Sequence, residues 1–157
     1  MSESKKILDA CCGSRMMWFN KENPLAVYMD IRKETHILCD GRTLKINPDV
    51  VADFTNMPFS DGKFKLVVLD PPHLKDAGDS SWICKKYGRL GQGWQEEIRK
   101  AFKECFRVLE DNGILIFKWS EDQVKVSEII KLSGRQPLFG HRSGKSGKTI
   151  WLCFMKL

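Results

Sequence analysis

Long hydrophobic runs are absent from this 157-residue sequence, which has no stretch of the roughly 18 to 20 consecutive apolar residues that a transmembrane helix needs. The N-terminal residues MSESKK also lack the apolar core of a secretory signal peptide. The composition, with 42% hydrophobic and 29% charged residues, is close to that of ordinary globular proteins. We therefore expect a soluble cytoplasmic protein without membrane contact, folded as a single domain over residues 1–157.

The six cysteines and three histidines show no spacing typical of a metal site, because no C-x-x-C pair is present. Zinc held by scattered residues remains an alternative, but we expect reduced, mostly buried thiols and no metal. The excess of Lys and Arg gives a net charge of +6, which suits an anionic partner but is also common in soluble proteins. No hydrophobic heptad is visible, so a monomer is the default expectation.

Four short apolar runs mark the first half of the chain. They lie at residues 6–11, 26–29, 50–52 and 64–69, and each finishes on a carboxylate or at a glycine. Because these runs do not alternate with polar residues, they are typical of strands that are buried on both faces of a parallel sheet. The polar or helical stretches between them agree with strands of one parallel sheet flanked by helices.

The second half begins with a helical pattern. Apolar residues recur at helical spacing over residues 94–109, and Asn112-Gly113 is expected to stop this helix before a fifth strand at 114–119. This order of helix, turn and strand again predicts a parallel sheet with helical connections.

The C-terminal part predicts a second helix and a hairpin. Ser120 and Gln123 form a capping-box pattern that opens a helix, which closes at Gly134. Residues 136–157 then read as two strands joined by a turn-rich segment at 142–148. The count of expected strands is therefore seven, with the last two forming a hairpin.

Acidic residues gather at the ends of the first four predicted strands. Asp30, Asp53 and Asp70 end the second, third and fourth strands, and Asp9 to Gly13 close the first. In an open parallel sheet, ligands bind outside the carboxyl ends of the strands, where the strand order reverses. The sequence therefore predicts one ligand site that is lined by these residues.

The segment after the first strand, ILDACCGSRMMWF, combines a tight turn at Gly13 with an expected short helix, so that backbone can approach a ligand closely. It is not the G-x-G-x-x-G of a pyrophosphate-binding loop, because Cys11 and Met16 stand where glycines are needed. Asp30 follows Gly13 by seventeen residues, near the spacing of about twenty at which an acid meets ribose hydroxyls. The pattern favours an adenosine-containing ligand without phosphates, and an Asp that caps a turn is the alternative.

Together these motifs resemble those of the class I S-adenosylmethionine-dependent methyltransferases. The resemblance covers nearly the whole chain and rests on D-x-x-x-G at residues 9–13, Asp30, Asp53-Phe54, LDPPH at 69–73 and RVLEDNGILIF at 107–117. More narrowly, CCGSRMMWF with DIR and DPPHL is similar to small stand-alone methyltransferases of prophages and bacterial genomes. The resemblance implies an α/β, Rossmann-like fold whose seven-stranded, mostly parallel sheet has an antiparallel C-terminal hairpin strand and helices on both faces.

The resemblance also implies S-adenosylmethionine as the cofactor. Its expected contacts are Asp9, Ala10, Cys11 and Gly13 at the methionine part, Asp30 at the ribose hydroxyls, Asp53 at the adenine amine and Phe54 against the adenine ring, with Asp70 beside the reacting group. Arg15 stands where related nucleic-acid amino-methyltransferases usually carry another glycine. Our hypothesis is that Arg15 pairs with the cofactor carboxylate, since a guanidinium beside a sulfonium is otherwise unfavourable.

Asp70-Pro71-Pro72-His73 indicates the type of reaction and supplies the candidate catalytic residues. An exocyclic amine of a base is a poor nucleophile until acceptors polarise its hydrogens, and the Asp70 carboxylate and Pro71 carbonyl are two such acceptors. The fourth residue would cover a flipped base, and related enzymes carry Tyr, Phe or Trp there, whereas this chain has His73. A D-P-P sequence that merely ends a strand at a turn is the alternative.

Basic and aromatic residues interleave in the segment that follows, at residues 74–93. The basic residues are Lys75, Lys85, Lys86 and Arg89, and the aromatic ones are Trp82 and Tyr87, with Trp94 next along the chain. This mixture suits contact with a nucleic-acid backbone and its bases, and the length suits a lid. A solvated loop whose aromatic residues pack beneath it is the alternative.

The sequence therefore predicts methyl transfer to an exocyclic amino nitrogen of a nucleic-acid base, with adenine favoured and DNA or RNA as the substrate. A methyltransferase that acts on a protein side chain or a small molecule is the alternative enzyme. A non-catalytic accessory protein that binds the cofactor would keep Asp30 and would not need Asp70.

Overall fold

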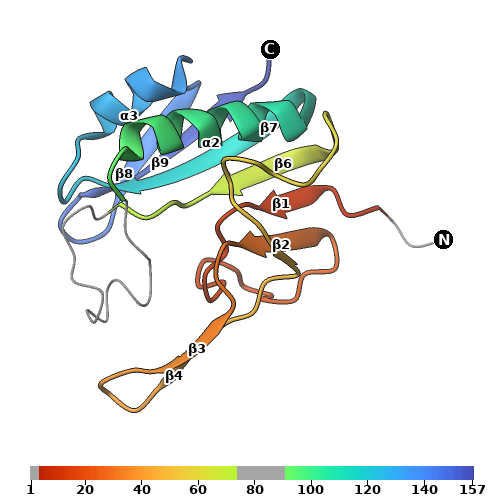
Figure 1. The fold of residues 1–157 in the computed structure, drawn as a ribbon. Helices are drawn as coiled ribbons and strands as arrows, with labels where there is room; N and C mark the ends of the chain where they lie inside the picture. The colour runs from red at the N-terminus through yellow and green to blue at the C-terminus, as the bar shows by residue number, and fades with distance from the viewer. Residues whose placement is uncertain (1–3, 74–90) are drawn as a thin grey trace.

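The structure is a computed structural model that describes residues 4–73 and 91–157, and a seven-stranded sheet forms its centre (Figure 1). The strands of this sheet are β1 (Ile7–Asp9), β2 (Ala26–Asp30), β5 (Val50–Val51), β6 (Phe64–Leu69), β7 (Leu109–Ser120), β8 (Phe139–Ser143) and β9 (Thr149–Met155). Their spatial order is β5-β2-β1-β6-β7-β9-β8. The seven predicted strands are confirmed, although β7 begins at Leu109, five residues before the expected start of that strand at Ile114.

The pairing of the strands places a crevice at the middle of the sheet. β1 pairs in parallel with β2 and β6, β2 with β5, and β6 with β7, whereas β9 is antiparallel to both β7 and β8. This is the predicted mostly parallel sheet with a C-terminal hairpin. The chain moves outward from β1 to β2 and β5, and then returns to β6 on the other side of β1. The switch point therefore lies between the carboxyl ends of β1 and β6.

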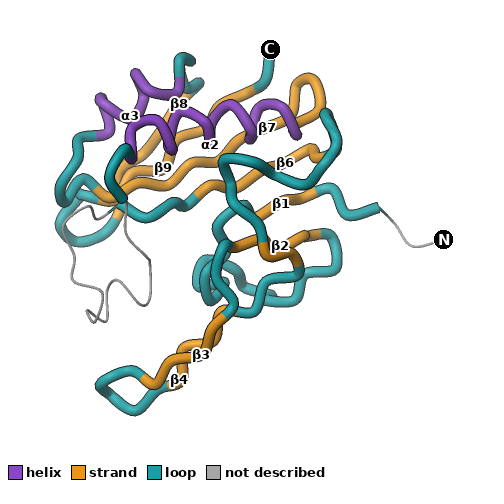
Figure 2. The backbone as a smooth tube through the Cα atoms, viewed as in Figure 1, coloured by secondary structure: helices purple, strands orange, loops and turns teal. Residues whose placement is uncertain are grey.

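The two described helices, α2 (Trp94–Val108) and α3 (Val126–Ser133), pack on one face of the sheet (Figure 2). Apolar residues at helical spacing form a single buried stripe on α2, as the sequence pattern predicts. In this stripe the ring of Phe102 lies 4.9 Å from that of Phe117 on β7. Because side chains alternate along a strand, Phe117 faces the helices and Lys118 faces the opposite side. No helix in the described ranges is long and apolar enough to cross a membrane.

On the opposite face, residues 10–25 form turns where we expected a short helix after Gly13 (Figure 2). The expected helix is wrong because Gly13 (φ 50°) and Arg15 (φ 61°) both adopt left-handed backbone conformations, which interrupt a right-handed helix. Trp18 holds this segment instead, with its ring edge-on to Tyr28 and 5.1 Å away between centroids. Within the described residues, helices thus cover only one face of the sheet.

The Asn112-Gly113 pair does not stop α2. The helix ends at Val108, and the pair lies inside β7, where Asn112 has a φ of 64°. A Cβ at position 113 would lie 2.8 Å from the Glu110 carbonyl oxygen, so the close approach of the backbone requires glycine. The turn signal therefore marks an irregularity within a strand rather than the end of a helix.

The expected capping box is also absent. Ser120 is the last residue of β7, and α3 begins only at Val126. The Glu121 carboxylate accepts the Val126 N–H at 2.8 Å, so a glutamate satisfies one of the free donors of the first turn. The predicted end of this helix at Gly134 is confirmed, with a φ of 66°.

A two-stranded hairpin, β3 (Glu34–Ile37) with β4 (Thr43–Ile46), was not predicted. It projects away from the main sheet (Figure 1). Polar and apolar residues alternate along β4, and Asp40-Gly41 lies in the turn between the two strands, with Gly41 at a φ of 83°.

Candidate ligand site at the carboxyl edge of the sheet

Two adjoining cavities lie at the carboxyl edge of the sheet. Cavity A has a volume of about 260 Å³ and cavity B of about 270 Å³, and Cys11 and Arg32 line both. Together they reach the range of about 300 to 1,000 Å³ that is typical of small-molecule sites. The predicted site residues that line cavity A are Cys11, Gly13, Asp70, Pro71 and His73. Those that line cavity B are Ala10, Cys11, Asp30, Asp53, Phe54 and Pro72.

Asp30, the last residue of β2, lines cavity B but is only 1% exposed. Its Oδ2 accepts the Gly13 N–H at 2.9 Å, and its Oδ1 accepts the backbone N–H and the Nε–H of Arg32 at 2.9 and 3.3 Å. Each carboxylate oxygen has two lone pairs, so Oδ1 is filled and Oδ2 keeps one position. Asp30 can therefore accept one further hydrogen bond from a ligand.

Asp53 and Phe54 line another part of cavity B. Asp53 is exposed, and its Oδ1 accepts the N–H and the hydroxyl of Thr55 at 2.8 and 2.7 Å. Its Oδ2 has no hydrogen-bond partner within the described residues. Phe54 is half-buried against the core. The pair offers an acceptor beside an aromatic side chain, which are the two features that the expected adenine contact requires.

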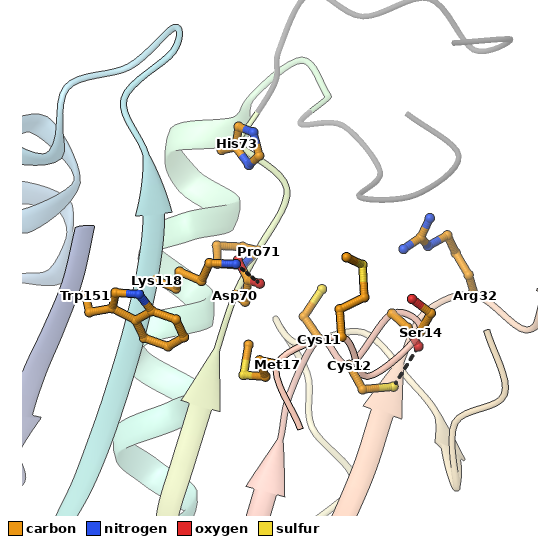
Figure 3. A pocket seen from close by; sticks show the side chains of 12 residues that line it. Cys11, Cys12, Ser14, Met17, Arg32, Asp70, Pro71, His73, Lys118 and Trp151 are labelled. Carbon is orange, nitrogen blue, oxygen red and sulfur yellow. Dashed lines mark hydrogen bonds and ion pairs between the residues drawn. The ribbon is translucent and has the colours of Figure 1, made fainter. Parts of the chain in front are cut away.

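Asp70 follows β6 and meets Lys118 in cavity A (Figure 3). Lys118 Nζ lies 3.3 Å from Asp70 Oδ2, because Leu69 and Phe117 are register partners on neighbouring parallel strands. Burial raises the pKa of the Asp70 carboxyl, and the Lys118 ammonium opposes that shift. Asp70 Oδ1 and the Pro71 carbonyl oxygen have no hydrogen-bond partner in the described part of the chain. Both can therefore accept a hydrogen bond from a ligand in cavity A.

His73 lies at the rim of cavity A, apart from the Asp70–Lys118 pair (Figure 3). Its ring is edge-on to Trp119 at 6.4 Å between centroids, and its Nε2 lies 3.8 Å from Asp122 Oδ2. Burial lowers the pKa of His73, while the Asp70 and Asp122 carboxylates act in the opposite direction. The expected lid segment at 74–93 lies outside the described residues, except for its last three positions.

Asp9 lines neither cavity, so the structure does not bring its side chain together with the other predicted cofactor contacts. The side chain is fully buried, where its Oδ2 accepts the Trp18 indole N–H at 2.7 Å and its Oδ1 accepts the Cys11 N–H at 3.4 Å. Burial raises the pKa of Asp9 to about 7. Asp9 therefore stabilises the turn that follows β1.

The buried Asp9 makes stability depend on pH. Between about pH 4 and 7 the unfolded chain loses this proton while the folded chain keeps it, so the folded state binds more protons and stability falls as the pH rises. The slope that Asp9 contributes reaches about 1.4 kcal/mol per pH unit. We expect Asp9→Asn to flatten the fall, as measured by urea unfolding across this window. An identical pH dependence in the two proteins would contradict the burial of an ionisable Asp9.

Arg15 also lines neither cavity, so the structure does not place it with the other predicted cofactor contacts. Its guanidinium donates to the carbonyl oxygens of Lys21 at 2.6 Å and Asn47 at 2.8 Å, and it lies 3.7 Å above the Tyr28 ring. These contacts hold it on the outer side of the turn segment. Arg32, which lines both cavities, is the arginine positioned beside the site.

Arg32, Lys118 and Trp151 line the cavities but were not predicted. Lys118 carried a signal, since it is the charged residue in the otherwise apolar stretch ILIFKW. No local sequence pattern indicated Trp151, because it lies at the site only through its pairing with Lys118 on the antiparallel strand β9. Register with a strand distant in the chain is not visible in a local pattern.

The thiols in cavity A are poorly suited to act as nucleophiles. Burial raises the pKa of Cys11 well above its usual range and the pKa of Cys12 to about 12, so both thiols are neutral at pH 7. In residues 4–73 and 91–157, no group of His, Cys, Asp or Glu is arranged to hold a metal ion. The oxygen and nitrogen side-chain groups that the described residues bring to cavity A come from Ser14, Arg32, Asp70, His73 and Lys118, and Pro71 adds its carbonyl oxygen.

Comparisons with solved structures identify the fold. No family model matches this chain, and no curated protein matches its sequence. The chain is similar to the PH0226 protein of Pyrococcus horikoshii, with a TM-score of 0.63 at 15% identity, over 100% of this chain and 84% of the other. It is also similar to a TehB-like SAM-dependent methyltransferase from Corynebacterium glutamicum, with a TM-score of 0.59 at 16% identity, over 100% and 83%.

A third similar structure is a geranyl diphosphate methyltransferase in complex with GPP and sinefungin. Its TM-score is 0.54 at 10% identity, over 100% of this chain and 72% of the other. Together with the order and directions of the strands, these similarities show that the chain has the Rossmann-like fold of the S-adenosylmethionine-dependent methyltransferases.

Proposed function

We propose that this chain binds S-adenosylmethionine across cavities A and B and transfers its methyl group to an exocyclic amino nitrogen of a nucleic-acid base, with adenine favoured. The observation that carries the proposal is the meeting of Asp30, Asp53 and Asp70 in two adjoining cavities at the switch point of the sheet. Each of these carboxylates keeps an acceptor position for a ligand. A sulfonium nucleoside suits three carboxylates, because it donates through its hydroxyls and amine and carries no phosphate for them to repel.

Cavity B supports the nucleoside part of the cofactor. Asp30 Oδ2 would accept a ribose hydroxyl, Asp53 Oδ2 would accept the adenine amine, and Phe54 would lie against the ring. Arg32 covers Asp30, so we expect its side chain to shift when the ribose enters. Arg32 lines both cavities, and we propose that its guanidinium pairs with the cofactor carboxylate at their junction.

Cavity A supports the acceptor amine. Asp70 Oδ1 and the Pro71 carbonyl oxygen would accept its two N–H groups and so draw the nitrogen lone pair out of the ring system. Bound there, S-adenosylmethionine would supply an electrophilic methyl group to this nitrogen, with the neutral thioether as the leaving group that keeps the electron pair. Asp70 would take the proton that the nitrogen then loses, a role that its raised pKa favours, and would pass it to water.

A cationic groove on the helix face supports a polyanionic substrate. The groove has a volume of about 510 Å³, and its cationic lining residues are Arg99, Lys103, Arg107, Lys131, Arg135 and Lys156. Arg99 and Arg107 pair with carboxylates, but the other four have no acidic partner within the described residues. Phosphate groups of a nucleic acid would supply the missing counter-charges. Since Lys118 in cavity A faces away from the helices, only a long ligand would contact both places.

A small-molecule acceptor is the second candidate. It is favoured by the similarity of the fold to that of a geranyl diphosphate methyltransferase, which shows that chains of this shape include enzymes named for small acceptors. A small acceptor would fill cavity A and would leave the cationic groove without a role in turnover.

Transfer of a labelled methyl group to fractions of a cell extract tests the proposal. We expect labelled product that nuclease removes and protease leaves. The variant Lys103→Glu/Lys131→Glu reverses two charges of the groove, and we expect it to label polynucleotide more weakly. The slope of log K for polynucleotide binding against log salt concentration should become shallower by about 0.9 for each phosphate contact that is lost. Affinity for S-adenosylhomocysteine should not change.

Lys5→Glu/Lys65→Glu is the matched control, because it makes the same change in net charge outside the groove. Label confined to small molecules or to protease-sensitive material would contradict a nucleic-acid substrate. A chain that binds the cofactor and labels no fraction would contradict the enzyme and favour an accessory role.

A further inference from the structure

The position that usually covers the acceptor base does not supply an open aromatic face here. His73 occupies it, and the ring of His73 is engaged edge-on with Trp119 and lies near Asp122. Among the described residues that line cavity A, Trp151 is the remaining aromatic side chain. We propose that Trp151, together with the Asp70–Lys118 pair, forms the acceptor subsite, and that it selects a planar heteroaromatic amine with a ring nitrogen beside the amino group.

This inference rests on the proposed function, because it assigns the acceptor end of the same site. Three neighbouring strands deliver the three side chains in a row. Asp70 follows β6, Lys118 lies beside it on β7, and Trp151 is the register partner of Lys118 on β9. Register partners point to the same face of a sheet, so Trp151 and Lys118 lie together on the face away from α2 and α3. Figure 3 shows the indole beside the Asp70–Lys118 pair.

Trp151 is suited to stacking because it is only half-buried and lines the cavity with its ring. The Lys118 ammonium lies 5.5 Å from the indole centroid, within the range of a cation–π contact, which holds the two side chains near one another. Stacking on an aromatic ring favours a flat π-system over an aliphatic chain of similar size. The subsite therefore favours a base or a similar ring over an aliphatic amine.

The Asp70–Lys118 pair adds a hydrogen-bond pattern to the aromatic surface. Asp70 can accept from an amino group, and Lys118 carries three donors and no acceptor. Their polar atoms are 3.3 Å apart, so an acceptor and a donor stand side by side. Adenine and cytosine each present an amino donor next to a ring-nitrogen acceptor on the Watson–Crick edge, which is the edge that enzymes read on a flipped base. The pattern matches this edge, whereas an amine without a neighbouring acceptor would use Asp70 alone and would leave the Lys118 donors unused.

Binding of free adenine to the full chain loaded with S-adenosylhomocysteine tests the subsite, because the loaded nucleoside occupies cavity B. We expect calorimetry or ligand-observed NMR to detect adenine, and to show weaker binding of purine, which lacks the amine, and of cyclohexylamine, which is not flat. Trp151→Ala should weaken adenine binding by about 5- to 100-fold. Trp151→Phe should restore most of the affinity, and S-adenosylhomocysteine affinity should stay unchanged in both variants.

Phe139→Ala on β8 is the matched control, since it removes an exposed aromatic side chain outside the cavity. Adenine affinity that is unchanged in Trp151→Ala, or cyclohexylamine binding that equals adenine binding in the wild type, would overturn the subsite. The proposed function fails separately, if the wild-type chain does not bind S-adenosylhomocysteine at all. Normal loading of Trp151→Ala with S-adenosylhomocysteine shows that the variant is folded.

Discussion

Replacement of Asp70 by Ala is expected to lower the rate of methyl transfer by at least about 10²-fold while cofactor affinity is largely retained. The reason is that Asp70 would act on the acceptor nitrogen in cavity A, whereas the ribose and adenine contacts lie in cavity B. Single-turnover transfer of label to polynucleotide measures the rate, and calorimetry with S-adenosylhomocysteine measures the affinity. The loss should appear in the transfer step more than in substrate binding.

Two further variants separate chemistry from folding at this position. Asp70→Ala leaves the Lys118 ammonium without its partner, so Asp70→Asn, which preserves shape, should show a comparable loss of rate with less effect on stability. Asp40→Ala, at the exposed tip of the β3–β4 hairpin, is the matched control for loss of an aspartate. A transfer rate in Asp70→Ala close to that of the wild type would remove Asp70 from the chemistry.

Replacement of Asp30 by Ala is expected to weaken cofactor binding by about 1.5 to 3 kcal/mol, the worth of hydrogen bonds to a charged group, which corresponds to about 10- to 150-fold. The variant loses the acceptor for the ribose hydroxyl and also the carboxylate that holds the Gly13 N–H and Arg32. Calorimetric titration with S-adenosylhomocysteine gives the affinity directly.

Asp30→Asn distinguishes the two contributions, because its amide oxygen can still accept a hydrogen bond although its amino group cannot. We expect a smaller loss of affinity than in Asp30→Ala. The Asp40→Ala protein again serves as the reference for a lost aspartate elsewhere. Cofactor affinity in Asp30→Ala equal to that of the wild type, in a protein with unchanged thermal unfolding, would exclude the ribose contact.

The sheet could be predicted because its signals are local. Runs such as FKLVVL at 64–69 are apolar on both faces, and the buried stripe of α2 repeats at helical spacing. The segment 10–25 could not be predicted, because its shape depends on the packing of Trp18 on Tyr28 and on the Asp9 carboxylate, and two residues with positive φ exclude the expected helix. Tertiary contacts overrode the local pattern there.

In the site, too, residues with a local sequence signal could be predicted, and residues positioned by tertiary contacts could not. Asp30, Asp53 and Asp70 were predictable, because the end of a strand in a parallel sheet fixes where a side chain lies. Asp9 pairs in register with Tyr28 and Val68, so it lies two residues before the level of Asp30 and Asp70, and its side chain is fully buried. Arg15 lies outside both cavities because its guanidinium donates to the carbonyl oxygens of Lys21 and Asn47. Lys118 and Trp151 lie at the site because of the register of β7 with β6 and of β9 with β7, and this register is determined only when the sheet assembles.

The most direct measurement is a calorimetric titration of the wild-type chain with S-adenosylmethionine, followed by competition with adenosine. We expect saturable binding of a single molecule per chain, displaced by adenosine, because the carboxylates at the ends of β2, β5 and β6 line one adjoining pair of cavities. Absence of binding, or binding that adenosine leaves untouched, would contradict this expectation.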